Sequence, residues 1–180
     1  MREFFLVLAV AVGVWIAGES LAGPVGKIPW FGWTEGVQQG RKERRFLLVY
    51  FHKPACPFCE RMDAVTFADR GVQDAVRRCF VPVKVESFDA RQFPGPSGEK
   101  LSGILLRDRF KVSTFPTVLV LDFRDPFREY MRIPGYLGPK DFLEMLTYVT
   151  QGWYTEMSFD EFLDRLLNKR LPAKGSRGAC

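Results

Sequence analysis

The sequence is poor in the residues that build metal and nucleic-acid sites. It contains a single histidine, His52, and four cysteines in 180 residues. Together with Cys56 and Cys59, this histidine makes three candidate ligands, too few for a closed structural zinc site. The body of the chain also lacks a basic run interleaved with aromatic residues, so we expect no nucleic-acid partner. We accordingly expect neither a metal nor another cofactor.

Long apolar runs are missing as well, apart from a short one near the start. Residues 4–17 are uncharged and apolar, but the run is shorter than the ~20 residues that a spanning helix needs. Arg2 precedes it, and Ser20-Leu21-Ala22 follows with small residues where a signal peptidase cleaves. We predict a signal peptide over 1–22, cleaved near Ala22, and hence a periplasmic or secreted protein. An uncleaved membrane anchor is the alternative.

The composition is that of one globular domain with extensions. The hydrophobic content is 47%, and 26 basic against 21 acidic residues give a net charge of +5, which weakly favours anionic partners. We predict a linker and amino-terminal segment over 23–33, a domain over 34–152, a helical extension over 153–168 and a disordered basic tail over 169–180.

Four apolar segments are expected to be strands, with helices between most of them. The continuous run 46–51 is typical of a central strand buried on both faces, and further strands are expected over 81–85, 118–121 and 129–133, the last two as a hairpin. This order predicts an α/β fold with a mixed sheet flanked by helices and an extra carboxy-terminal helix. A loop insertion is expected over 87–100.

Local signals predict where several helices begin. Thr34 is expected to cap a first helix, and Phe58, Met62 and Val65 recur at helical spacing after the second cysteine of the pair. Gly138-Pro139 is expected to open a later helix with proline at its first position. Residues 158–161 form a capping-box pattern before the last helix.

Cys56 and Cys59 form a C-x-x-C motif between the buried strand and a helix, a context that indicates redox chemistry. The helix start offers unpaired N–H groups and a positive dipole end, which stabilise a thiolate, and the spacing puts both sulfurs on one helix face. Pro57 occupies a position where its missing N–H costs nothing. We predict that Cys56, the more exposed sulfur, is the nucleophile and that Cys59 resolves the mixed disulfide.

Three positive or potentially positive side chains lie close to the cysteine pair in the sequence. His52, Lys53 and Arg61 would further favour the thiolate.

The cysteine pair also has alternative interpretations. A purely structural disulfide between residues this close would add little stability. A copper(I)-handling module that uses the same pair of thiolates, or a non-catalytic binding or chaperone module, remain alternative functions.

A second motif, Thr114-Phe115-Pro116-Thr117, lies just ahead of an apolar strand. Together with the C-x-x-C, it resembles the thioredoxin superfamily over about residues 33–152. This resemblance implies that Pro116 follows a cis peptide bond and faces the cysteines. It also implies that Phe115 presents backbone groups to an extended substrate segment, and that Pro57 and Phe58 contact substrate. Without the upstream motif, Pro116 would be expected only to open a strand.

Within the superfamily, residues 50–52 and 55–59, Pro134-Gly135-Tyr136 and Gly138-Pro139 resemble the periplasmic SoxW-type thioredoxins. This resemblance implies protein thiols and disulfides as substrates, and a membrane thiol reductase as the electron donor. The chain departs from cytosolic thioredoxins in two ways: Ala55 replaces their tryptophan, and Tyr50 occupies the position of their buried aspartate. Lys84 or Glu86 would be the acid–base substitute.

The remaining cysteines and the early aromatics are expected to be structural or unassigned. Cys79 lies on an apolar helical face and is expected to pack in the core, whereas no role is assigned to Cys180. Trp30, Phe31 and Trp33 are expected to pack rather than bind substrate. Together these observations predict an exported, monomeric thiol–disulfide oxidoreductase that reduces protein disulfides.

Overall fold

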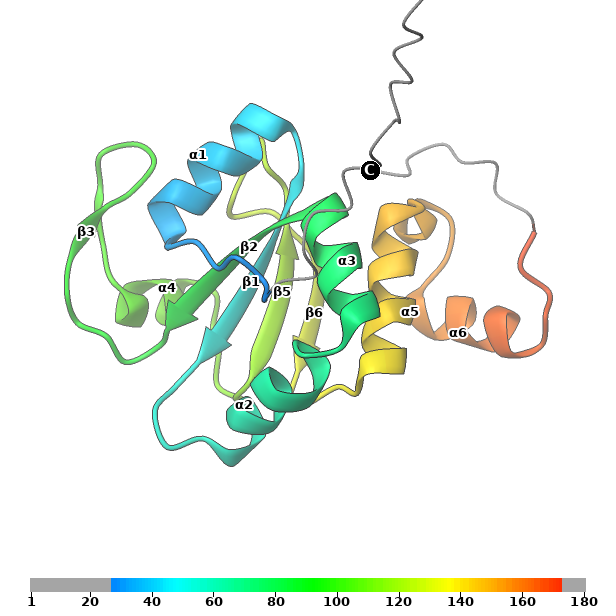
Figure 1. The fold of residues 1–180 in the computed structure, drawn as a ribbon. Helices are drawn as coiled ribbons and strands as arrows, with labels where there is room; N and C mark the ends of the chain where they lie inside the picture. The colour runs from blue at the N-terminus through cyan, green and yellow to red at the C-terminus, as the bar shows by residue number, and fades with distance from the viewer. Residues whose placement is uncertain (1–26, 173–180) are drawn as a thin grey trace, which may run out of the picture.

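The computed structural model describes residues 27–172, which form a four-stranded mixed sheet (Figure 1). The strand order is β2-β1-β5-β6; β1 and β2 are parallel, and β5 is antiparallel to both β1 and β6. The strands are β1 (Phe46–His52), β2 (Phe80–Glu86), β5 (Thr117–Leu121) and β6 (Glu129–Pro134). The mixed sheet and its final hairpin are therefore confirmed. The predicted signal peptide, residues 173–180 of the predicted tail and Cys180 lie outside the described residues.

Helices connect the strands and follow them. They are α1 (Trp33–Glu43), α2 (Pro57–Arg61), the π-helix η1 (Met62–Thr66), α3 (Arg70–Cys79), α4 (Gly103–Arg109), α5 (Pro139–Thr150), the 3-10 helix η2 (Trp153–Thr155) and α6 (Phe159–Leu167). Inside the predicted loop insertion, the short strands β3 (Phe93–Pro94) and β4 (Lys100–Leu101) pair as a separate ribbon. That pairing was not predicted, because two-residue strands leave no periodic pattern in the sequence.

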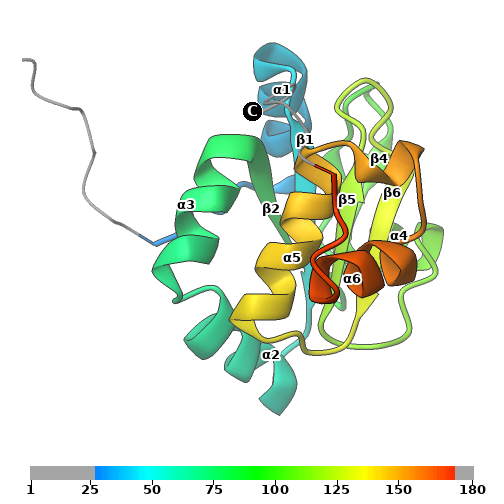
Figure 2. The same ribbon diagram turned by 90° about the vertical axis from the view of Figure 1, so that its right-hand side faces the viewer.

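The sheet separates two hydrophobic clusters. Figures 1 and 2 show α3 and α5 covering one face, with α1 and α4 on the other. Along β1, Leu48 and Tyr50 belong to the cluster under α3 and α5, whereas Leu47, Val49 and Phe51 belong to the cluster under α1 and α4. Alternate side chains of a strand point to opposite faces, so a continuously apolar strand has to be covered on both sides. The prediction of a doubly buried central strand is confirmed.

Several helix starts follow the local signals. Pro139 is the first residue of α5 after Gly138, and the Ser158 hydroxyl accepts a hydrogen bond from the Glu161 N–H at the start of α6. The prediction that Thr34 caps α1 is wrong. The cap is Gly32, and the Thr34 hydroxyl instead donates to the carbonyl of Pro94 in β3. Thr34 therefore connects α1 to the insertion.

The apolar face predicted after the cysteine motif is also wrong in part. Met62 is fully buried, but Phe58 and Val65 are 58% and 44% exposed. For Val65 the reason is that α2 continues into the wider π-turn of η1, which rotates later residues relative to a 3.6-residue period. Cys59, Met62 and Thr66 form the buried face instead.

The ends of the described region pack on the domain. Trp30 packs against the rings of both Tyr50 and Phe67, which also contact each other, and the main chain of Phe31 forms hydrogen bonds with β2. At the other end, Phe162 of α6 is completely buried, and its ring packs at a tilt against that of Tyr148 in α5. Cys79 is only partly buried at the edge of the same core cluster. Among residues 27–172, no helix is long and apolar enough to cross a membrane.

Candidate active site

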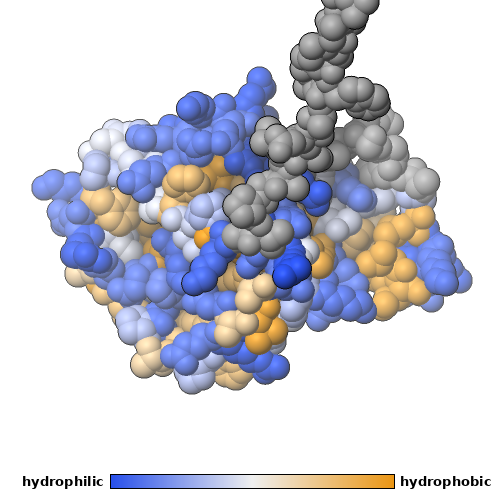
Figure 3. Space-filling view, viewed as in Figure 1, coloured by the Kyte–Doolittle hydropathy of each residue, from blue (hydrophilic) through white to orange (hydrophobic). Residues whose placement is uncertain are grey.

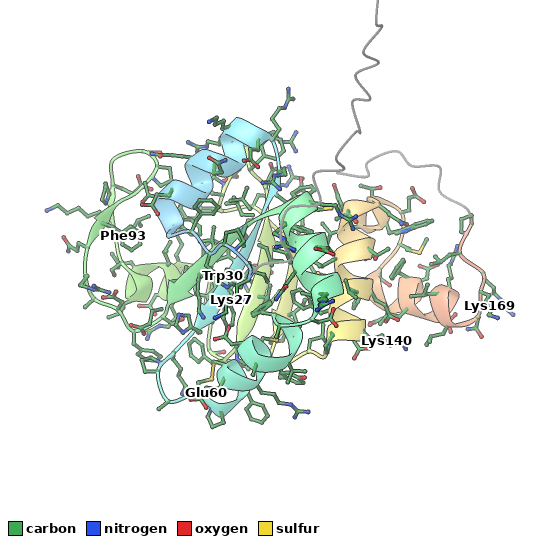
Figure 4. All side chains as sticks on the ribbon, in the orientation of Figure 1. Lys27, Trp30, Glu60, Phe93, Lys140 and Lys169 are labelled. Carbon is green, nitrogen blue, oxygen red and sulfur yellow. A yellow bond between two sulfur atoms is a disulfide. The ribbon has the colours of Figure 1, made fainter. Side chains whose placement is uncertain are left out.

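One edge of the sheet brings the two predicted motifs to the same place. β1 ends at His52, and the following turn leads to Cys56, which caps α2. Because β5 is antiparallel to β1, its first residue, Thr117, pairs with Phe51 near the end of β1. Pro116 therefore lies at the edge from which α2 begins. Figure 4 locates this edge by Glu60, which lies in α2.

Cys56 and Cys59 are joined by a disulfide, which confirms that their sulfurs can meet. Their Cα atoms lie 5.2 Å apart. The Cys59 N–H, one of the free donors of the first helical turn, donates to the Cys56 Sγ at 3.1 Å. The Cys56 carbonyl accepts from the Glu60 N–H at 3.0 Å, and Pro57 is the first residue of α2. The same N–H would stabilise a thiolate on Cys56 after reduction.

The expected difference in exposure between the two cysteines is wrong. Cys56 is 4% exposed and Cys59 is 3% exposed. The disulfide holds both side chains in the core cluster that contains Tyr50 and Met62. Pro57 and Phe58, the residues between the two cysteines, are exposed instead. Figure 3 shows apolar surface at the lower edge of the molecule, where α2 lies in Figure 1. Position in the helix, rather than exposure, distinguishes the two sulfurs.

Tyr50 lies beneath the motif in the position where cytosolic thioredoxins have an aspartate. Its hydroxyl donates to the Cys59 carbonyl at 3.2 Å. Burial, reinforced by the negative charge of Asp63, raises the pKa of Tyr50 well above its ordinary value. The phenol therefore stays protonated at neutral pH and acts as a hydrogen-bond donor that fixes the helix turn.

The three side chains expected to favour the thiolate differ from one another in charge and in contacts. Burial, followed by the charge of Lys84, lowers the pKa of His52, so its imidazole is neutral at pH 7 and does not supply the expected charge. Lys53 lies over the ring of Phe115, 5.6 Å from its centre, and the Arg61 guanidinium lies 4.4 Å from the centre of the Tyr136 ring.

Neither candidate acid–base residue on β2 reaches Cys59 by a hydrogen bond in the described structure. The Lys84 ammonium pairs with Asp63 at 3.0 Å and lies 5.0 Å from the centre of the Tyr50 ring. The Glu86 carboxylate accepts from the Phe88 N–H at 2.9 Å. Lys84 thus contacts the ring of Tyr50, and the hydrogen bond of Glu86 stabilises the loop after β2.

The peptide bond between Phe115 and Pro116 is cis, as the resemblance implied. The Pro116 carbonyl accepts from the Gly135 N–H at 2.7 Å, and the Thr117 hydroxyl closes the turn onto the Thr114 carbonyl. Within residues 27–172, the main-chain N–H and carbonyl of Phe115 have no hydrogen-bond partner. Both groups are consequently available to an extended segment of another protein.

Phe88 is a neighbour of this site that sequence reasoning missed. It follows β2, is 51% exposed, and its ring centre lies 5.7 Å from that of Phe115. A single aromatic residue in a loop carries no periodic signal, so only the folded chain reveals the contact.

No cluster of three or more histidine, cysteine, aspartate or glutamate side chains suited to a metal ion occurs in the described part of the chain.

Residues 35–150 match the family described as a thioredoxin-like domain. The chain belongs to this family. Among solved structures, a thioredoxin from Thermus thermophilus has 25% identity and a TM-score of 0.56, and the alignment covers 69% of this chain and 88% of that one.

Two further structures share the fold at lower identity. A thioredoxin-fold protein from Helicobacter pylori has 21% identity and a TM-score of 0.57, with 71% of this chain and 83% of that one covered. A DsbH oxidoreductase has 15% identity and a TM-score of 0.56, with 73% and 92% covered. No curated protein matches the chain.

Proposed function

We propose that this chain is an exported, monomeric thiol–disulfide oxidoreductase that reduces protein disulfides through Cys56 and Cys59. The observation that carries the proposal is the Cys56–Cys59 disulfide at the start of α2, with the Cys56 sulfur accepting the Cys59 N–H. Membership of the thioredoxin-like family and the name of the DsbH oxidoreductase support the same chemistry. Export rests on the signal-peptide pattern of residues 1–22.

The reaction begins with the reduced pair. The Cys56 thiolate attacks one sulfur of a substrate disulfide, the substrate S–S bond breaks, and the released substrate thiolate takes up a proton. Cys59 then loses its proton and attacks the Cys56 sulfur of the mixed disulfide. This step forms the Cys56–Cys59 bond and releases the second substrate thiol. Two electrons have passed from the pair to the substrate.

The surroundings of the pair have distinct roles in this scheme. Phe115 pairs its free main-chain groups with the substrate segment, while Pro116, Pro57 and Phe58 form the surface around the sulfurs. A membrane thiol reductase restores the dithiol by the same exchange in reverse, a role inferred from the resemblance to SoxW-type thioredoxins. Copper(I) transport by the same two thiolates is the competing function.

Reduction of insulin by dithiothreitol tests the proposal. We expect the protein to accelerate insulin reduction, and Cys56→Ser to fall to the uncatalysed rate because the attacking sulfur is gone. Circular dichroism of the variant checks that the fold is intact. Full activity in folded Cys56→Ser would reject the assignment. Tight stoichiometric copper(I) binding by a wild-type protein without exchange activity would favour the metal-handling alternative.

A further inference from the structure

Four side chains form a continuous row beside the disulfide, which we call the cation–aromatic row. The Lys53 ammonium lies 5.6 Å from the centre of the Phe115 ring. The Phe115 ring lies 5.7 Å from that of Phe88, and the Arg107 guanidinium lies 4.8 Å from the centre of the Phe88 ring. Two rings are therefore bracketed by two positive charges.

The row is assembled from four separate segments at the cysteine edge of the sheet. Lys53 lies in the turn before Cys56, and Phe115 directly precedes Pro116. Phe88 comes from the loop after β2, and Arg107 from α4. Phe88 is 51% exposed, so this ring offers an open apolar surface. A protein held on the main chain of Phe115 would meet the row with the residues next to its reactive cysteine.

The acidic side chains near the cation–aromatic row have partners of their own or compensate it only in part, so the row keeps a net positive charge. Asp89 pairs with Arg91 at 2.6 Å, and the Glu86 carboxylate accepts from the Phe88 N–H. Asp108 pairs with Arg107 itself at 2.6 Å, which partly compensates that end. Lys53 has no ion-pair partner within residues 27–172. The uncompensated charge of the row therefore lies at Lys53, in the turn that leads from β1 to Cys56.

We infer that the cation–aromatic row selects substrates: it docks an extended protein segment that carries an acidic residue and an apolar residue beside its reactive cysteine. The carboxylate lies against the Lys53 ammonium, and the apolar side chain packs on the Phe88 and Phe115 rings. This inference rests on the proposed function and adds to it the chemistry of the preferred substrate.

Two disulfide-linked peptides that differ only in a glutamate or a lysine next to the cysteine provide the test. The wild-type protein is expected to reduce the glutamate peptide with a kcat/KM about two- to fivefold higher, the range of an exposed ion pair. The difference is expected in KM, because the contact forms before the chemical step. Lys53→Gln should abolish the preference, and Phe88→Ala should raise KM severalfold for both peptides.

Matched controls separate this inference from the proposed function. Lys42→Gln removes an exposed lysine from the last turn of α1. That end of the helix lies far from α2 and the cysteines (Figure 1), so the variant should keep the preference. Arg109→Gln removes an α4 arginine that lies over Phe127 instead, and should leave both KM values unchanged.

Equal kcat/KM for both wild-type peptides, or an unchanged preference in Lys53→Gln, would overturn the inference. Failure to reduce even a small disulfide such as hydroxyethyl disulfide would instead reject the proposed function.

Discussion

Tyr50 illustrates how a single residue changes the surroundings of the cysteine pair. A buried aspartate in its place would accept and release protons. The phenol, kept protonated by burial and by Asp63, donates instead to the Cys59 carbonyl. The sequence identified this replacement but not its consequence, because the direction of the hydroxyl and the position of Asp63, which pairs with Lys84 of β2, depend on tertiary contacts.

His52 predicts how stability depends on pH. Its pKa is lowered in the folded protein, chiefly by burial, whereas the unfolded chain has an ordinary histidine pKa of about 6.5. Below that value the unfolded state binds a proton that the folded state resists. The free energy of unfolding should therefore decrease as the pH falls from 8 to 5. Urea unfolding of the oxidised protein at several pH values measures this decrease.

The matched variant for this prediction is His52→Gln. Since His52 is the only histidine of the chain, the variant removes the one side chain that normally titrates in this interval. We expect a smaller decrease of the unfolding free energy between pH 8 and pH 5 in His52→Gln. Identical pH profiles for the two proteins would show that His52 does not carry the effect.

At the scale of helices and strands, the sequence predicted elements with a strong periodic or capping signal. The run 46–51, Gly138-Pro139 and Ser158 were each interpreted correctly. The helix after Cys59 was not, because the π-turn of η1 shifts Val65 to the surface. Periodicity assumes a uniform helix, and nothing in residues 62–66 alone marks the wider turn.

The contact between α4 and β2 predicts a large effect at Gly103. A Cβ added at this first residue of α4 would overlap the carbonyl oxygen of Glu86 at the end of β2. The neighbour is backbone and cannot rotate away, so Gly103→Ala should destabilise the protein by about 2 kcal/mol. Gly138→Ala, whose added carbon meets open space, should cost clearly less. Denaturant unfolding compares them, and equal losses would contradict this account of the contact.

At the scale of the whole molecule, the order of strands and helices was sufficient to predict the architecture. The resemblance to thioredoxins added the cis bond at Pro116, which local sequence could not indicate. Neither the order of the elements nor the resemblance to thioredoxins predicted the cation–aromatic row. Lys53, Phe88, Arg107 and Phe115 are widely separated in the chain, and only the sheet and the insertion bring them together.

The two cysteines are almost equally buried, so exposure cannot assign their roles in the mechanism. Since both are nearly buried in the disulfide state, the account distinguishes them by their places at the helix start. Cys56 should therefore attack substrates and Cys59 should release them.

Trapping of mixed disulfides tests this assignment most directly. Reduced Cys59→Ser and Cys56→Ser proteins are incubated with insulin, and the adducts are mapped by mass spectrometry of digested peptides. The account predicts that Cys59→Ser accumulates a dithiothreitol-sensitive adduct on Cys56, because no thiol remains to resolve it, and that Cys56→Ser accumulates none on Cys59. An adduct on Cys59 in equal yield, or no adduct on Cys56, would contradict the account.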